Sequence, residues 1–280
     1  MFNDVVIFGL LCALLGLFVG SFLNVVIHRL PIMLEREWSE QAAEVRGEPI
    51  EAGPRFNLAT PRSRCPHCGT QVAAFDNIPV VSFLLLRGKC RHCSAPIGGR
   101  YPLIETCSAV LSGLAAWHFV DPVTTFGALI LIWALIALAF IDLDTQLLPD
   151  NITLPLTWIG LLFNLNGTFA SINDAVIGAV AGYMSLWLVF QLFRLVTGKE
   201  GMGYGDFKLL AAIGAWLGWQ MLPITILLSS VVGAAVGICL IVFSRHGREN
   251  PIPFGPYLAA AGLIALFFGQ ALNARYLLLL

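Results

Sequence analysis

The feature that most constrains this chain is a series of apolar blocks, each about as long as a membrane-spanning helix. Such a helix needs about 20 residues. Only 12% of the 280 residues are charged, whereas a soluble domain carries about a quarter. We therefore expect an all-α polytopic membrane protein with about eight transmembrane helices. The candidate spans lie at about 5–28, 101–120, 124–142, 151–167, 174–197, 207–220, 222–243 and 255–277.

Three parts are expected along the chain. Residues 1–28 form a first transmembrane helix, 29–100 a polar cytoplasmic segment, and 101–280 a membrane-embedded helical bundle. The first apolar block has no basic residue before it and no small-residue cleavage site, so we expect a retained span rather than a signal peptide. The weakest boundary is the break at Trp219–Met221, between the sixth and seventh spans.

Basic residues predict the orientation, because they favour the cytoplasmic side of short loops. Ten of the 16 Lys and Arg residues lie in the 29–100 segment. With eight spans, an inward-facing segment also brings five later basic residues inside: Arg194, Lys199, Lys208, Arg245 and Arg248. Only Arg275 then falls outside. We therefore expect both termini to face outward.

The polar segment contains two Cys-x-x-Cys pairs, Cys65–Cys68 and Cys90–Cys93, with 21 residues between them. Four thiolates at this spacing are typical of a structural zinc site. A full set of cysteines leaves no open position for a reacting water. Because the segment has few apolar residues, metal binding would supply folding energy. The rival interpretation is two disulfides, which rarely persist in the cytoplasm.

Two acidic groups lie at the ends of apolar spans, where ionisable residues are costly and usually functional. Asp142 ends the third span, and Asp206 begins the sixth after a glycine-rich stretch, Gly201–Gly205. Two spans separate them, so the chain returns to its starting side and both aspartates belong at the cytoplasmic face. Glu105, near the start of the second span, is a third acid whose role is left open between structure and function.

Paired carboxylates suit peptide hydrolysis. One acts as a base on water while the other donates a proton to the carbonyl oxygen, and the pair shares one proton. A helix N-terminus favours the ionised form and a helix C-terminus disfavours it. We therefore expect Asp206 to be the base and Asp142 the proton donor. The alternative for Asp206 is a helix N-cap, and Asp144 and Asp150 are expected to be caps or supports.

Taken in order, these motifs resemble the type IV prepilin leader peptidases, bifunctional enzymes that also N-methylate their product. The resemblance implies a GxGD-type aspartyl protease, with Asp206 closing the Gly203–Asp206 motif and Asp142 as its partner. The matching stretches are Gly20–Pro31, the two Cys pairs, Gly99–Pro102, Ile141–Asp150, Gly201–Lys208 and Pro251–Tyr257.

The resemblance further implies substrates, a cofactor and a location. Prepilins and pseudopilins of pili and type II secretion would be cut after a glycine, at the cytoplasmic face of the bacterial inner membrane. The new N-terminal residue would be methylated from S-adenosylmethionine. The cysteine segment would serve methylation and substrate handling. Gly88 and Lys89 match a stretch linked with methylation, but no nucleotide-binding fingerprint identifies a donor site, and no nucleic-acid partner is expected.

Three alternatives compete with this interpretation. An ion-coupled transporter would place carboxylates near mid-bilayer and show an internal repeat. A non-enzymatic assembly factor would explain the cysteines but leave both acidic motifs without a role. A GxGD protease of another branch would share the chemistry but would require neither the zinc segment nor prepilin substrates.

Overall fold

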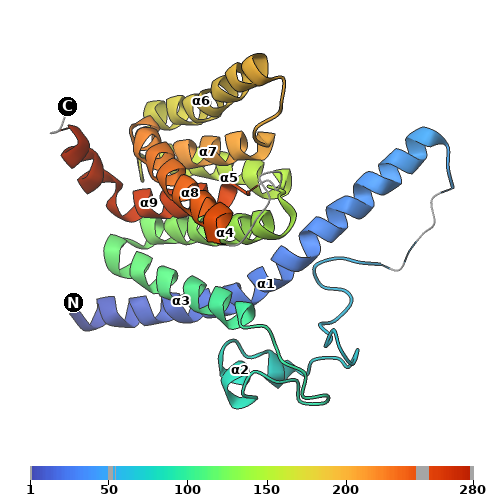
Figure 1. The fold of residues 1–280 in the computed structure, drawn as a ribbon. Coiled ribbons are helices and arrows are strands. Elements are labelled where there is room, and N and C mark those ends of the chain that lie inside the picture. Colours follow the sequence, from blue (N-terminus) through green and yellow to red (C-terminus); the bar gives the residue numbers. More distant parts are fainter. Residues whose placement is uncertain (1, 50–52, 54, 244–251, 278–280) are drawn as a thin grey trace. The chain divides into compact units, whose positions relative to one another are not determined.

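The computed structural model describes residues 2–49, 53, 55–243 and 252–277, and most of these residues are helical. Within these ranges there are no strands. The helices, drawn in Figure 1, are α1 (Phe2–Arg46), α2 (Val81–Leu85), α3 (Arg100–Phe119), α4 (Pro122–Thr145), α5 (Asp150–Asn164), α6 (Ile172–Thr197), α7 (Tyr204–Leu217), α8 (Leu222–Phe243) and α9 (Gly255–Leu277), with 3₁₀ turns η1 (Ala74–Asn77) and η2 (Trp219–Met221).

The chain divides into two compact units, residues 1–117 and residues 118–280. The first holds α1, the cysteine segment and almost all of α3, and the second holds α4 to α9. The three parts expected from the sequence, divided at residues 28 and 100, were defined by where the chain enters and leaves the membrane. The two compact units are defined by packing, so the three-part division stays a prediction.

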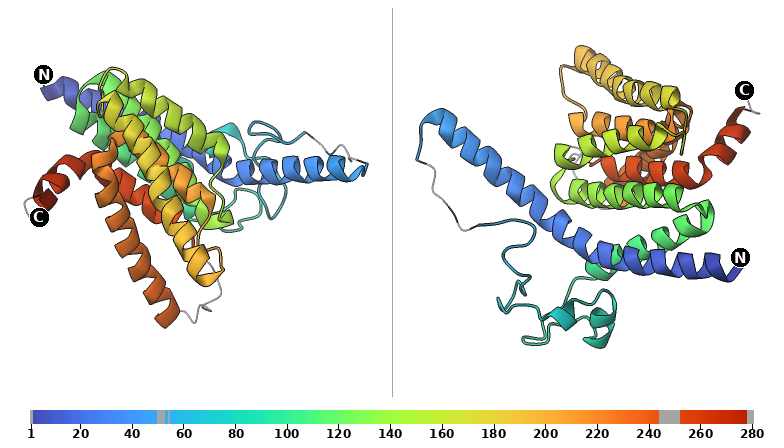
Figure 2. Two further views of the ribbon diagram at one scale, coloured as in Figure 1. Left: turned by 90° about the horizontal axis from the view of Figure 1, so that it is seen from above. Right: turned by 180° about the vertical axis from the view of Figure 1, so that it is seen from behind.

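Helix α1 extends beyond the expected first span. The helix that contains residues 1–28 continues without a break to Arg46, over 45 residues, and is visible as the long blue helix in Figure 2. The end of the span near residue 28 stays a prediction. Pro31 lies inside it and removes one backbone donor without ending the helix. The helix continues past Pro31 because Leu34–Arg46 consists mostly of strong helix formers. The apolar half of α1 is thereby followed by a polar half of the same helix.

Close packing through small residues joins α1 to α3 in the first unit. A Cβ on Gly20 would lie 2.7 Å from the Cα of Glu105. The Ser108 hydroxyl donates to the Gly16 carbonyl at 2.6 Å, and the Asn24 side chain donates to the Tyr101 carbonyl at 3.2 Å. Such close backbone approach and interhelical hydrogen bonding are typical of helices that associate in membranes.

Helix α7 is the centre of the second unit, where it contacts α5, α6 and α9. Every residue from Leu209 to Leu217 is buried. A Cβ on Gly214 would overlap the backbone of Gly178 on α6, so the two helices touch along their backbones. Figure 1 shows α7 enclosed by its neighbours. A helix that is apolar on all sides is typical of such a buried position.

Five helices among the described residues are long and apolar enough to cross a membrane: α1, α4, α6, α8 and α9. This supports a multi-pass membrane protein. Helices α5 and α7 have only 15 and 14 residues, so each spans about 22 Å or less at 1.5 Å per residue, short of a 30 Å bilayer core. The count of eight spans therefore stays a prediction. The expected break at Trp219–Met221 is confirmed, since η2 separates α7 from α8.

Candidate active site

Asp142 lies in the last turn of α4, as expected from the sequence. The helix ends at Thr145, and the Gln146 N–H donates to the Asp142 carbonyl at 2.9 Å. The Asp142 side chain is buried, and its Oδ2 accepts a hydrogen bond of 2.9 Å from the Gly255 N–H. Gly255 is the first residue of α9, where a backbone N–H has no partner within the helix and suits an anion.

Asp206 lies in the first turn of α7, which begins at Tyr204. The N-cap position belongs to Gly203, so the N-cap alternative for Asp206 is wrong. The side chain is buried, and its Oδ1 has no hydrogen-bond partner among the described residues. A Cβ on Gly205 would lie 2.7 Å from the Cβ of Leu148. The glycine before the aspartate therefore allows this end of α7 to approach the segment after α4.

Asp142 and Asp206 lie in the second unit, and each is linked to Leu148 through a neighbouring glycine. Leu148 is a neighbour of both aspartates' glycines. It lies against Gly205, and its Cδ2 would be 3.2 Å from a Cβ on Gly255. We call Asp142, Asp206, Gly205, Gly255 and Leu148 the carboxylate site. A buried carboxylate oxygen without a partner calls for an explanation, and a reacting water or substrate amide would provide one.

Of the two acids next to this site, Asp150 forms an ion pair between helices. Asp150 begins α5, whose N-cap is Pro149, and its carboxylate accepts from the Lys208 ammonium at 2.6 Å. This ion pair ties the start of α5 to the first turns of α7. Asp144 is exposed at the end of α4.

The four cysteines of the first unit form a cluster that fits a metal ion. Their sulfurs all lie within 4.8 Å of one another, and the Cys65 and Cys93 sulfurs are 3.8 Å apart. Tetrahedral zinc with Zn–S bonds of about 2.3 Å requires sulfur separations of about 3.8 Å. A disulfide would bring its sulfurs to about 2.05 Å, and all four cysteines are free.

The two Cys-x-x-Cys turns have the same backbone geometry. In the first, the Cys65 N–H donates to the Thr70 carbonyl and the Gly69 N–H to the Cys65 carbonyl, both at 2.9 Å. In the second, the Cys90 N–H and the Ser94 N–H make the equivalent bonds at 2.9 and 3.0 Å. Hydrogen bonding with Thr70 lowers the pKa of Cys68 to about 6.

Two contacts brace the cysteine segment. The Arg91 guanidinium forms a two-pronged ion pair with Asp76, with Nε at 2.9 Å from Oδ2, and this hydrogen bonding lowers the pKa of Asp76. The buried Arg29 of α1 donates to the Asn57 carbonyl at 2.9 Å and to the Pro61 carbonyl at 2.5 Å. The first contact joins η1 to the second Cys-x-x-Cys turn, and the second joins α1 to the loop before the first turn.

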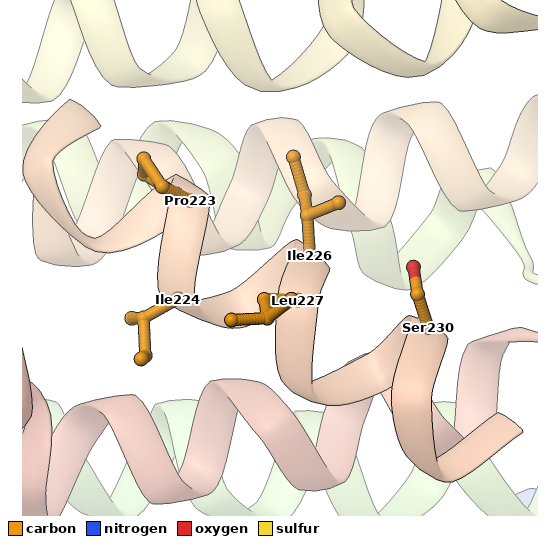
Figure 3. Close-up of a pocket in the computed structure, with 5 residues that line it drawn as sticks. All are labelled: Pro223, Ile224, Ile226, Leu227 and Ser230. Carbon is orange, nitrogen blue, oxygen red and sulfur yellow. The ribbon is translucent and has the colours of Figure 1, made fainter. Parts of the chain in front are cut away.

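Other candidate residues lie in the first unit. Glu105 accepts a 2.7 Å hydrogen bond from the Val80 N–H. Gly88 packs on Phe83, and Lys89 is exposed. The link of Gly88 and Lys89 with a methyl-donor site stays a prediction. Among the described residues, the pocket drawn in Figure 3 is lined by five residues of α8 and by neither aspartate: Pro223, Ile224, Ile226, Leu227 and Ser230.

Comparison with known proteins decides the family. The model of the Bacterial Peptidase A24 N-terminal domain matches residues 14–119, and that of the Type IV leader peptidase family matches residues 129–238. A Prepilin leader peptidase/N-methyltransferase from Stutzerimonas stutzeri is 58% identical over 269 residues, covering 95% of this chain and 93% of the relative. The chain belongs to the type IV leader peptidase family.

Other relatives of this leader peptidase family carry the same name. The proteins from Aeromonas hydrophila and Pseudomonas aeruginosa are 59% and 56% identical, over 94% and 96% of this chain. The alignments cover 92% and 93% of those relatives. No solved structure matches the chain. Neither the transporter nor the assembly-factor alternative finds support among these relatives.

The family matches cover most of the residues singled out above. Asp142 and Asp206 both lie in the stretch matched by the leader peptidase family, and the four cysteines lie in the stretch matched by the N-terminal domain. Gly255 lies outside both stretches. Sequence reasoning placed it in a notable motif, Pro251–Tyr257, but could not show that its N–H reaches a residue 113 positions earlier.

Proposed function

We propose that this chain is a membrane aspartyl peptidase that removes the leader peptides of type IV prepilins and pseudopilins. Asp142 and Asp206 are its catalytic pair. The observation that supports the proposal is the burial of both carboxylates, at the end of α4 and the start of α7, around the shared neighbour Leu148. One of them has an oxygen without a partner among the described residues. The relatives named Prepilin leader peptidase/N-methyltransferase support the substrate class.

The chemistry follows from the pair. A water between the carboxylates loses a proton to one aspartate as it attacks the scissile carbonyl, while the other protonates the carbonyl oxygen. The assignment of Asp206 as base and Asp142 as proton donor stays a prediction. The N-terminus of α7 favours charge on Asp206, whereas the Gly255 N–H favours charge on Asp142.

A second activity and a structural metal complete the proposal. The new N-terminal residue is methylated, with S-adenosylmethionine supplying the methyl group. Cys65, Cys68, Cys90 and Cys93 hold a zinc ion that supplies folding energy rather than catalysis, because four thiolates fill a tetrahedral site. The sulfur separations support this metal.

The proposed location is the bacterial inner membrane, with the carboxylate site and residues 29–100 at the cytoplasmic face and both termini outward. The bilayer is thus a partner and nucleic acid is not. The distribution of Lys and Arg supports this orientation. Two of the basic residues counted for this orientation, Arg245 and Arg248, lie outside the described residues.

A cleavage assay tests the proposal. Purified protein is incubated with a prepilin-like peptide bearing a Gly-Phe junction, with and without S-adenosylmethionine, and products are identified by mass spectrometry. We expect cleavage in both reactions and methylation only with the donor. Asp142→Asn and Asp206→Asn should abolish cleavage, whereas Asp144→Asn, on the same helix as Asp142, should retain it. Failure of folded wild-type protein to cleave would refute the peptidase, and cleavage without methylation would remove only the second activity.

A further inference from the structure

The short helix α2 carries an exposed apolar surface within the polar cysteine segment. Val81, Leu84 and Leu85 are spaced i, i+3 and i+4, so they share one face of the helix. Their exposed fractions are 46%, 67% and 78%. We call these three residues the α2 patch. An apolar patch on an otherwise polar segment indicates a surface that is covered in the working protein.

Two contacts of Glu105 determine the position of this patch along α1. Its carboxylate accepts from the Val80 N–H, directly before α2, at 2.7 Å. On its other side, the Cα of Glu105 lies against Gly20 of α1. Gly20 precedes Ile27, the end of the apolar run of α1, by seven residues, or about 10 Å of helix.

The start of α2 is therefore held beside the apolar half of α1, not beyond it. Helix α1 is a candidate membrane span, and its long apolar run lies in that half. Tyr101 marks the same region, because its carbonyl accepts from Asn24 and its side chain is 51% exposed. Tyrosine is enriched where a membrane meets water.

We propose that the α2 patch inserts into the cytoplasmic leaflet and anchors the cysteine segment to the bilayer surface. The occupant is lipid, because the patch is tethered at the depth of a membrane-spanning helix. The charges agree, since the exposed Arg87 and Lys89 follow the patch and suit anionic headgroups. The inference is independent of the proposed peptidase activity and adds a membrane contact to a segment otherwise described only by its metal.

The patch is also held at its second end. The Gly88 N–H donates to the Phe83 carbonyl at 2.9 Å, and the Ile97 N–H donates to the Gly88 carbonyl at 2.7 Å. These bonds connect α2 to the second Cys-x-x-Cys turn. Insertion of the patch would therefore set the distance of the zinc cluster from the membrane.

Photo-crosslinking in nanodiscs of phosphatidylcholine and phosphatidylglycerol tests the anchor with the full-length chain. Benzoylphenylalanine replaces Leu85, and in separate variants Phe18 or Val45. Phe18 is 56% exposed in the apolar half of α1, and Val45 is 89% exposed at the far end of the same helix. We expect lipid adducts at Leu85 comparable to those at Phe18 and at least about fivefold above those at Val45, as for an interfacial segment.

The tether is tested in the same assay. Glu105→Leu removes the acceptor for Val80 and should lower the Leu85 adduct toward the Val45 level while leaving the Phe18 adduct unchanged. Glu105→Gln keeps an acceptor oxygen and should retain the adduct. Zinc content and gel filtration identify variants that have lost the fold.

Three results would overturn the proposal. Lipid adducts at Leu85 as low as those at Val45 would place the patch in water. Adducts joining Leu85 to another part of the chain would show that protein covers it. Adducts that shift from lipid to an added prepilin-like peptide would make the patch a substrate surface instead.

Discussion

At the scale of single residues, the carboxylate site depends on glycines that allow backbone to approach side chains. Gly255 brings its N–H to Asp142, and Gly205 lets α7 approach Leu148. In the cysteine segment, Gly69 has a different role, because its φ of +69° lies in the left-handed region that side chains disfavour. These two uses of glycine predict different consequences of substitution.

Gly255→Ala should impair catalysis without unfolding the protein. The new Cβ would lie 2.7 Å from Asp142 Oδ2, so the carboxylate must move. We expect kcat/KM for peptide cleavage to fall at least about tenfold, which is about 1.4 kcal/mol. Gly237→Ala is the matched control, because its Cβ meets nothing closer than 3.4 Å. Equal activity of the two variants would contradict a role for the Gly255 contact.

Gly69→Ala should weaken zinc binding through backbone strain alone. A Cβ there meets no atom within 4 Å, so the penalty is conformational, about 1–2 kcal/mol. We expect faster loss of zinc to a competing chelator than in wild type. Gly98→Ala also faces open space but has no left-handed φ, and it should behave like wild type. If both variants lost zinc at one rate, strain would not be the cause.

At the scale of helices, the apolar blocks predicted most elements within a few residues. The blocks at 222–243 and 255–277 coincide with α8 and α9. The length of an apolar block could not show that α7 is a helix of only 14 residues buried at the centre of the second unit. Burial inside a bundle and crossing a membrane require the same apolar residues, so only the surroundings of the helix distinguish the two.

Asn164, which sequence reasoning did not single out, holds the end of α7 in place. Its buried amide donates to the Ala215 and Trp216 carbonyls, both at 2.9 Å. Its oxygen accepts from the Phe169 and Ala170 N–H groups at 2.9 and 3.0 Å. All four hydrogen-bonding positions of the side chain are used. In the sequence, an isolated asparagine in an apolar block indicates only that a buried polar side chain needs hydrogen-bond partners. It does not indicate which residues those partners are.

Asn164→Leu should therefore destabilise the second unit. Four backbone groups would lose their partners, and each buried unsatisfied group costs about 1–3 kcal/mol. We expect the free energy of unfolding to fall by at least about 3 kcal/mol, measured as a lower Tm in detergent. Asn166→Leu changes an exposed asparagine two residues away and should leave Tm nearly unchanged. Similar Tm values for both variants would rule out the Asn164 network as a major source of stability.

At the scale of the whole molecule, the two candidate sites belong to different compact units. The cysteine cluster lies in residues 1–117 and the carboxylate site in residues 118–280. Each site is built from contacts within its own unit. Loss of the metal should therefore affect the first unit without dismantling the second.

Removing zinc should expose the cysteine segment to protease and leave the α4–α9 bundle intact. Metal ligation stabilises a segment with little apolar core, so Cys68→Ser or a strong chelator should abolish bound zinc and open trypsin sites such as Arg62 and Arg87. Cys239→Ser, outside the cluster, should keep wild-type zinc content and protection. Equal protection of zinc-free and wild-type protein would show that the segment folds without metal.

The sequence by itself determined the helical class, the two chemical motifs and the family they resemble, because apolar block length, Cys-x-x-Cys spacing and acids in apolar spans are local signals. Tertiary structure alone decided that Gly255 and Leu148 complete the carboxylate site, that Asn164 secures α7, and that Glu105 tethers α2. Each of these contacts joins residues far apart in the chain, and only packing determines which of many apolar or polar partners meet.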